Sequence, residues 1–156
     1  MQHEMRRAKR ALSEEEAREI LEEGIYGVLS TVDLDGEPYG TPISYVVVDG
    51  KIYFHSTNQG GHKVSNLEAN PLACFTVVDG VETLPSKFSS LYQSAIAFGT
   101  VKPVEDENKK EAALLALLEK YSADFIETGK KYLAAMRDKT LVYEFEIDRI
   151  TGKSNR

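Results

Sequence analysis

The residues with the clearest chemical potential form one polar cluster near the middle of the chain, HSTNQGGHK at positions 55–63. Hydroxyl groups come first, two glycines follow, and an imidazole and an ammonium stand in the first turn of a helix expected to begin at His62. A lysine at the amino end of a helix opposes the helix dipole unless an anion binds there. Backbone N–H groups of a glycine bend and a helix start can bind such an anion. The cluster therefore predicts a site for a phosphate-sized anion, with donors from Ser56, Thr57 and Lys63.

A plainer interpretation of the same cluster is a flexible Gly60-Gly61 turn beside solvated His62 and Lys63 side chains. The spacing matches neither the GxxxxGK(S/T) phosphate loop nor the GxGxxG dinucleotide motif. No cysteine or carboxylate stands at ligand spacing from the histidines, so we predict no metal site. Cys74 lies in an apolar run and is expected to pack as a small hydrophobic residue.

Periodic apolar residues predict that strands position this cluster and that helices lie at the periphery. We expect strands over residues 25–32, 38–48, 51–56, 72–78, 92–104 and 140–147. We expect helices over residues 13–24, 62–69 and 105–121, and a fourth helix capped by Ser122. Residues 79–90 are expected to form a loop with little regular structure, and residues 148–156 a polar tail.

Local signals predict several element boundaries. Ser13 and Glu16 match a capping box, in which a hydroxyl and a carboxylate satisfy free N–H groups at a helix start. Gly24 is expected to end that helix in a left-handed conformation, and Asn70-Pro71 to end the second helix in the same way. Asp49-Gly50 predicts a type I′ hairpin turn, because both residues accept a positive φ.

The first three strands follow one another too closely for the crossover connections that parallel strands need. Pro42 has no backbone N–H, so its strand is expected to lie at a sheet edge or to contain a bulge there. Gly99 is expected at another bulge. A closed barrel would also remove exposed strand edges. We therefore predict a mainly β fold, an antiparallel barrel of six strands with peripheral helices.

Length and composition indicate one globular domain of ordinary kind. The 156 residues are 42% hydrophobic and 28% charged, and we expect an extension over residues 1–12 followed by one domain over residues 13–156. A net charge of −6 argues against partners such as nucleic acid or an anionic membrane. One cysteine and the lack of a signal-peptide pattern favour the reducing cytoplasm. The apolar helices after residue 104 expose more surface than one small core can bury, which favours a symmetric homodimer.

Several short phrases occur in a fixed order along the chain: YGVLST (26–31), YFH (53–55), GHK (61–63), NP (70–71), LYQS (91–94) and ITGK (150–153). This ordered set resembles the pyridoxamine 5′-phosphate oxidase-like split-barrel superfamily, and within it the nitroimidazole-resistance (nitroimidazole reductase) branch. The resemblance extends over nearly the whole chain after the first ten residues. It implies a six-stranded split barrel, a homodimer, and FMN bound in grooves at the dimer interface.

The resemblance also implies which residues contact the flavin. The strand at residues 41–45 would lie along the flavin ring, and the residues around Lys63 would hold the phosphate. Two further residues match positions that reach the cofactor in the oxidase. The implied cofactor-binding residues are Thr41, Pro42, Ile43, Ser44, Tyr45, His55, Ser56, Thr57, Gly61, His62, Lys63, Gln93 and Ser94. The implied phosphate residues coincide with the anion site predicted from residue types.

Two departures distinguish the chain from the oxidase proper. Thr41 stands where the oxidase has an arginine, and His55 stands where it has an aromatic hydroxyl. The carboxy-terminal motif by which the oxidase reads its substrate is not evident, so oxidation of pyridoxamine phosphate is not expected. In the nitroimidazole-resistance branch a histidine near the flavin is associated with redox chemistry. His55 is the best match and is our candidate catalytic residue.

The function expected on this basis is that of an FMN-dependent oxidoreductase. It would pass electrons from a reduced nicotinamide or another donor to a small acceptor such as a nitro-aromatic compound, with His55 as a proton donor. Two alternatives stay open: a non-enzymatic module that binds or stores flavin, and a haem-binding split barrel with a histidine on the iron. A deazaflavin is less expected than FMN, because no extra basic groove is evident for its long acidic tail.

Overall fold

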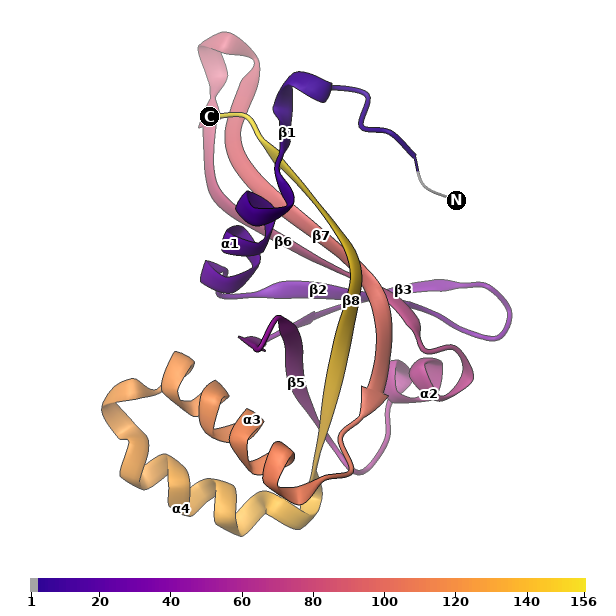
Figure 1. The fold of residues 1–156 in the computed structure, drawn as a ribbon, viewed down its shortest axis with the longest axis vertical. Helices are drawn as coiled ribbons and strands as arrows, with labels where there is room; N and C mark the ends of the chain where they lie inside the picture. The colour runs from indigo at the N-terminus through magenta and orange to yellow at the C-terminus, as the bar shows by residue number, and fades with distance from the viewer. Residues whose placement is uncertain (1–2) are drawn as a thin grey trace.

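Within residues 3–156, which the computed structural model describes, eight strands form a single antiparallel sheet (Figure 1). The strands are β1 (Ala11–Leu12), β2 (Gly27–Val32), β3 (Pro38–Ile43), β4 (Val46–Val48), β5 (Lys51–Thr57), β6 (Leu72–Leu84), β7 (Ser89–Pro103) and β8 (Thr140–Ser154). Their order is β3-β2-β6-β7-β8-β5-β4, and β1 pairs with β8. The fold class is as predicted, a mainly β antiparallel fold with peripheral helices, but the sheet has eight strands where six were predicted, because the short strands β1 and β4 are separate.

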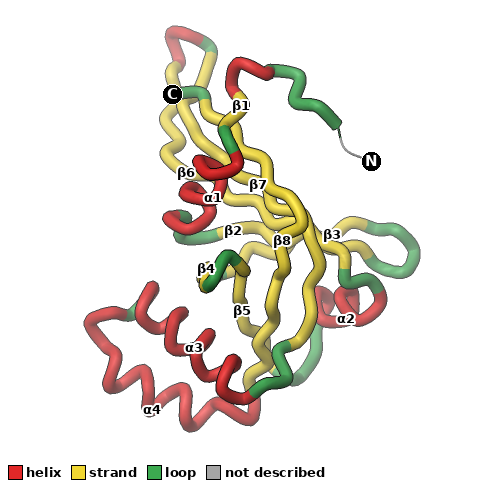
Figure 2. The backbone as a smooth tube through the Cα atoms, viewed as in Figure 1, coloured by secondary structure: helices red, strands yellow, loops and turns green. Residues whose placement is uncertain are grey.

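Helices flank the sheet at separate places (Figure 2). The α-helices are α1 (Glu14–Glu23), α2 (His62–Ala69), α3 (Glu107–Tyr121) and α4 (Ile126–Met136). Short 3-10 turns lie at Ala8–Arg10, Pro85–Lys87, Ala123–Phe125 and Arg137–Lys139. In Figure 1, α1 lies beside the upper half of β7 and β8, α2 lies beside β2, and α3 and α4 form a hairpin at the other end. No described helix is long and apolar enough to cross a bilayer.

Two apolar clusters hold these elements together. The larger one includes Phe54, Phe75 and Phe145 and lies between the strands and α1 and α2. The smaller one joins α3 to β4, β5 and β8 through Leu114, Leu117 and other residues. No residue of α4 is buried, so α4 depends on α3 for its position.

Several local predictions are confirmed. The reciprocal Ser13–Glu16 hydrogen bonds form the predicted capping box. Asp49 and Gly50 have φ of 51° and 77°, as a type I′ turn requires. Pro42 lies in β3, an edge strand of the sheet, and the pairing of β7 with β8 shifts register at Phe98/Gly99.

Other local predictions are wrong. Gly24 has a φ of −61° and Asn70 a φ of −146°, so neither residue adopts the left-handed conformation. Gly24 is needed for space, because a Cβ there would collide with the Tyr45 hydroxyl and Val77. The strand expected over residues 38–48 is broken into β3 and β4. Ser122 precedes a 3-10 turn and makes no side-chain cap.

The largest differences concern two segments expected to be irregular. Residues 79–90 continue β6, turn at Pro85–Lys87 and return in β7 as a long hairpin. Residues 148–154 continue β8, which pairs with β7 up to Gln93↔Ser154. Both segments are polar and lack the alternation of a half-buried strand, so only the pairing between distant segments makes them strands.

Candidate functional site

The predicted anion site lies where β5 ends and α2 begins. Gly60 and Gly61 have φ of 81° and 141°, and the space that a Cβ would occupy at either residue is open. Gly61 is the N-cap of α2 and makes no side-chain hydrogen bond, so within residues 3–156 no side chain caps the first N–H groups of the helix. Asn58 anchors the preceding loop, because its backbone N–H donates to the Lys139 carbonyl at 3.0 Å. The glycine bend and the helix start therefore present free donors on a fixed backbone.

Lys63 adds a positive charge to this helix start. Its side chain is half-buried, and desolvation lowers the pKa of the ammonium. Its Nζ lies 5.9 Å from the centroid of the Phe54 ring. Among residues 3–156, no carboxylate lies within ion-pair distance of Lys63. A half-buried cation with no anionic partner among the described residues is what a bound anion would stabilise.

The two histidines of the cluster have different surroundings. The His62 ring stacks on Tyr39 of β3, with centroids 3.9 Å apart and planes at 25°. His55 is exposed, yet partial desolvation and the charge of Lys63 lower the pKa of its imidazole below 6.5. The neutral imidazole is therefore the main form of His55 at pH 7. No group of three or more described histidine, cysteine or acidic residues is arranged to hold a metal ion.

The segment predicted to lie along a flavin ring spans β3 and the bend before β4. The side chains of Ile43 and Tyr45 are buried, and the Tyr45 hydroxyl donates to the Leu21 carbonyl at 2.5 Å. Pro42 is exposed and Ser44 half-buried. The Thr41 hydroxyl is buried without a hydrogen-bond partner among the described residues. Tyr45 therefore supports the segment from the core and does not offer its side chain to a ligand.

Two residues of α3 that the sequence did not single out fix the bend at Tyr45. Lys120 Nζ donates to the carbonyls of Gly24 at 2.6 Å and Tyr45 at 2.9 Å, and lies 3.9 Å from the Tyr45 ring centroid. The Tyr121 hydroxyl accepts from the Tyr45 N–H at 3.0 Å. Desolvation lowers the pKa of Lys120 to about 8. We call this pair the Lys120–Tyr121 clamp.

A second ionic cluster lies on β8, on the side of the sheet that faces α3. Glu144 is 1% exposed, and it accepts hydrogen bonds from Lys51 Nζ at 3.0 Å and the Tyr53 hydroxyl at 2.9 Å. Lys109 contacts the same carboxylate, and Lys102 Nζ lies 3.7 Å away. Burial alone would raise the pKa of Glu144, but the hydrogen bonds outweigh burial and hold the pKa at about 2. No local pattern in the sequence signals this cluster, because its members come from β5, β7, α3 and β8.

Within one chain Gln93 and Ser94 lie far along the strands from His55, although Ile43 of β3 aligns across β2 and β6 with Ala95 beside them. Ser94 pairs with Lys153 of β8, whereas His55 pairs with Val142 of the same strand. Eleven residues of strand separate these pairs, a contour of roughly 35 Å. Gln93 pairs with Ser154 at the carboxy-terminal end of β8, and its Nε2 donates to Asp79 at 3.2 Å. One mononucleotide cannot contact both groups of residues in a single chain.

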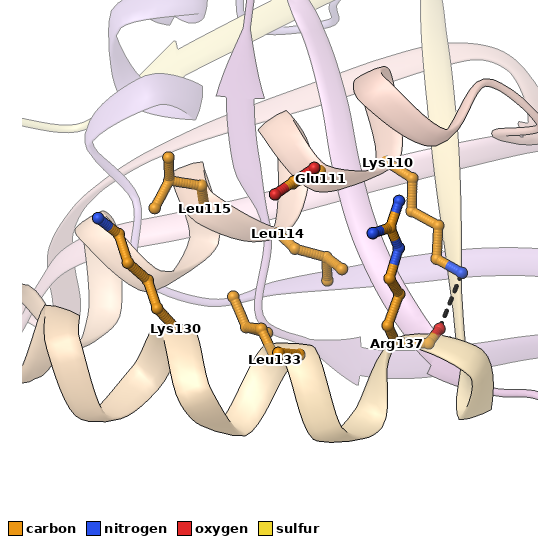
Figure 3. A pocket seen from close by; sticks show the side chains of 8 residues that line it. Lys110, Glu111, Leu114, Leu115, Lys130, Leu133 and Arg137 are labelled. Atoms are coloured by element: carbon orange, nitrogen blue, oxygen red, sulfur yellow. Dashed lines mark hydrogen bonds between the residues drawn. The ribbon is translucent and has the colours of Figure 1, made fainter.

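A separate hollow of about 220 Å³ lies between α3 and α4 (Figure 3). Leu114, Leu115 and Leu133 line it, and Lys110, Lys130 and Arg137 stand at its edge. Lys110 Nζ donates to the Arg137 carbonyl at 3.0 Å, which ties α3 to the end of α4. No residue predicted to bind a cofactor lines this hollow, so it is distinct from the candidate site.

Three solved structures are similar to this fold along most of its length. A conserved hypothetical protein from Mycobacterium tuberculosis has a TM-score of 0.82 and 23% identity, with 98% of this chain and 91% of that chain covered. A proposed 5-nitroimidazole antibiotic resistance protein from Bacteroides thetaiotaomicron has a TM-score of 0.74 and 23% identity, with 92% of this chain and 86% of that chain covered. An FAD and haem binding protein from Mycobacterium smegmatis has a TM-score of 0.70 and 25% identity, with 92% of this chain and 72% of that chain covered.

A comparison with curated protein sequences finds no match. The family described as pyridoxamine 5′-phosphate oxidase matches residues 13–154, which is nearly the whole chain. This match and the similar folds agree with the family resemblance found in the sequence. The chain therefore belongs to the pyridoxamine 5′-phosphate oxidase family.

Proposed function

We propose that the chain binds a flavin, FMN, along β3 and β5 with the phosphate at the start of α2. The observation that carries the proposal is the uncapped, glycine-flanked start of α2 beside Lys63, a half-buried ammonium without a carboxylate partner among the described residues. This donor set fits a phosphate monoester, because it combines free N–H groups with one positive charge. The M. smegmatis neighbour, an FAD and haem binding protein, supports a flavin in a related fold.

The same reasoning leads us to propose a homodimer with the flavin between its subunits. Gln93 and Ser94 are too far from Lys63 to share a ligand within one chain. They could share one if a second copy brings its Gln93 and Ser94 to the α2 start of the first. Exposed apolar residues of β2 and β6 offer surface for such a contact; they include Val28, Leu72 and Val78.

With FMN in this place, the proposed activity is electron transfer from a reduced nicotinamide or another donor to a small acceptor such as a nitro-aromatic compound. The bound isoalloxazine would supply the redox chemistry. The protein would hold the phosphate through Lys63 and support the ring segment through the Lys120–Tyr121 clamp. His55 is exposed at the site and neutral at pH 7, so it can exchange a hydrogen bond or a proton with an acceptor.

The decisive experiment is the visible spectrum of the purified protein, followed by titration with FMN of the cofactor-free chain. A flavin spectrum supports the proposal, and a haem spectrum supports the haem-binding alternative, with exposed His55 as the candidate ligand. Flavin that binds but is not reoxidised by acceptors in repeated turnovers indicates a storage module. A protein that binds neither FMN nor haem contradicts the proposed function.

Lys63→Ala tests the phosphate end of the site. Loss of a charged hydrogen-bond donor weakens binding by about 1.5–3 kcal/mol, so the Kd for FMN should rise roughly tenfold to more than a hundredfold. Lys131→Ala, at an exposed lysine of α4, is the control and should leave the Kd unchanged. An unchanged Kd in the folded Lys63→Ala variant would remove Lys63 from the site.

A further inference from the structure

The hairpin of β6 and β7 extends beyond the body of the sheet as an arm, residues 80–92, which Figure 1 shows at the top of the molecule. Phe88 stands at its tip and is 97% exposed. Its φ is 50°, a left-handed conformation that is unfavourable for a residue other than glycine. Glycine would avoid this cost, so the tip combines an unfavourable backbone conformation with a phenyl ring that the described part of its own chain leaves exposed.

The arm is braced at its base by the last residues of the chain. The Asn155 backbone N–H donates to the Tyr92 carbonyl at 2.9 Å, and its side-chain amide donates to the Ser90 carbonyl at 2.5 Å. Arg156 donates to the Gly80 carbonyl at 2.8 Å on the other strand. Both strands of the arm are therefore tied to the end of β8, which holds the tip in a defined position.

The position of the tip relative to Gln93 determines what it can reach. Phe88 precedes Gln93 by five residues along the chain, at most about 17 Å of extended backbone. In the proposed dimer, Gln93 of one copy contacts the flavin held by the other copy. The tip of the same arm then lies within about 17 Å of the same flavin, close enough to reach the edge of its site.

We propose that the arm carries Phe88 of one copy to the edge of the flavin site of the other copy, where its ring packs against a flat aromatic acceptor bound beside the flavin. This inference rests on the proposed function. A phenyl ring suits the ring end of the site and not the phosphate end, because aromatic rings stack favourably and offer no donor to an anion. The arm would then favour planar aromatic acceptors over aliphatic ones.

The chain contains no tryptophan, which makes a direct test possible. Phe88→Trp gives the protein a single indole, whose emission a neighbouring flavin quenches. We expect FMN to quench most of this emission in the dimer. Tyr132→Trp places the indole on an exposed position of α4 as the control and should be quenched much less. Dilution to the monomer should restore the emission of Phe88→Trp.

The outcomes separate this inference from the proposed function. If Phe88→Trp binds FMN as a dimer but is quenched no more than Tyr132→Trp, the arm does not reach the site and the inference is wrong. If the protein binds no FMN, the proposed function itself fails. Phe88→Ala supplies a second measurement: kcat/KM should fall several-fold for a nitro-aromatic acceptor and less for ferricyanide, with the Kd for FMN nearly unchanged. An equal loss for both acceptors would contradict the proposed preference.

Discussion

The charged side chains of Lys63 and Glu144 have very different surroundings in this fold. Glu144 is fully enclosed and receives hydrogen bonds from lysine and tyrosine side chains, so its charge is stabilised within the chain. Lys63 is half-buried and faces no carboxylate among the described residues. Glu144 therefore contributes to stability, whereas Lys63 is a candidate for binding a ligand.

Glu144→Gln should lower the free energy of unfolding by about 2 kcal/mol at pH 7, because it leaves clustered lysines without a buried counter-charge. The pKa of Glu144 is lowered from 4.5 to about 2, so its contribution is present above pH 4.5 and is lost as the pH falls from about 4.5 to 2. Urea unfolding at pH 7, 4 and 2.5 should show wild type and variant converging in acid. Glu146→Gln, at an exposed position of the same strand, is the control; an equal effect there would contradict the prediction.

At the scale of elements, α3 reaches the candidate site through its last turn. The Lys120–Tyr121 clamp contacts the carbonyl after α1 and the backbone of Tyr45, where β3 gives way to β4. The rest of α3 packs on β4, β5 and β8 through its apolar residues. The clamp thus connects the α3–α4 hairpin to the segment on which we place the flavin ring.

The clamp should give stability a specific pH dependence. Desolvation lowers the pKa of Lys120 from 10.5 to about 8, so the unfolded chain binds this proton more tightly than the folded chain. Stability contributed through this group should therefore rise as the pH increases from about 8 to 10.5. The aromatic groups beside it, Tyr45 and Tyr121, have raised pKa values and stay neutral over most of this range.

Thermal unfolding of wild type and Lys120→Met at pH 7, 8, 9 and 10 measures this contribution. The Tm of wild type should rise relative to that of the variant across the series. The arginine of Lys120→Arg does not titrate in this range, so the Tm of this variant should change with pH as the Tm of Lys120→Met does. If the Tm of wild type changes with pH in the same way as the Tm of both variants, Lys120 does not titrate between pH 7 and 10.

At the scale of the whole molecule, the long strands decide how the proposed site can be assembled. β7 and β8 span the length of the molecule, and the predicted cofactor residues lie near both of their ends (Figure 1). A site that uses residues from both ends must combine two copies. The arm and its exposed Phe88 lie near the end that carries Gln93 and Ser94.

A complementation experiment tests this assembly. Lys63→Ala and the double variant Gln93→Ala with Ser94→Ala should each bind FMN weakly as homodimers. Mixed and refolded together, they should form heterodimers in which one site is intact, so part of the high-affinity binding should return. No recovery in proven heterodimers would place the site within one chain. A wild-type protein that sediments as a monomer at micromolar concentration would contradict the shared site directly.

Several local features of the fold can be predicted from the sequence, because they depend on interactions between residues close together in the chain. The capping box at Ser13, the turn at Asp49-Gly50 and the span of α2 depend on residues a few positions apart, and all three are as predicted. The family and the anion-site cluster also follow from contiguous phrases. Residue patterns of this kind need no knowledge of what packs against them.

The features that join separate elements of the chain could be identified only from the contacts in the folded structure. Residues 79–90 are strands because β6 and β7 pair with each other there, and residues 148–154 because they pair with β7, although neither sequence alternates as a half-buried strand does. Lys120 and Glu144 have their hydrogen-bond partners on other elements, so no local sequence pattern indicates their roles. The separation of Gln93 from Lys63 is likewise a matter of strand length and register. Such arrangements depend on contacts between residues far apart in sequence, which a single sequence does not reveal.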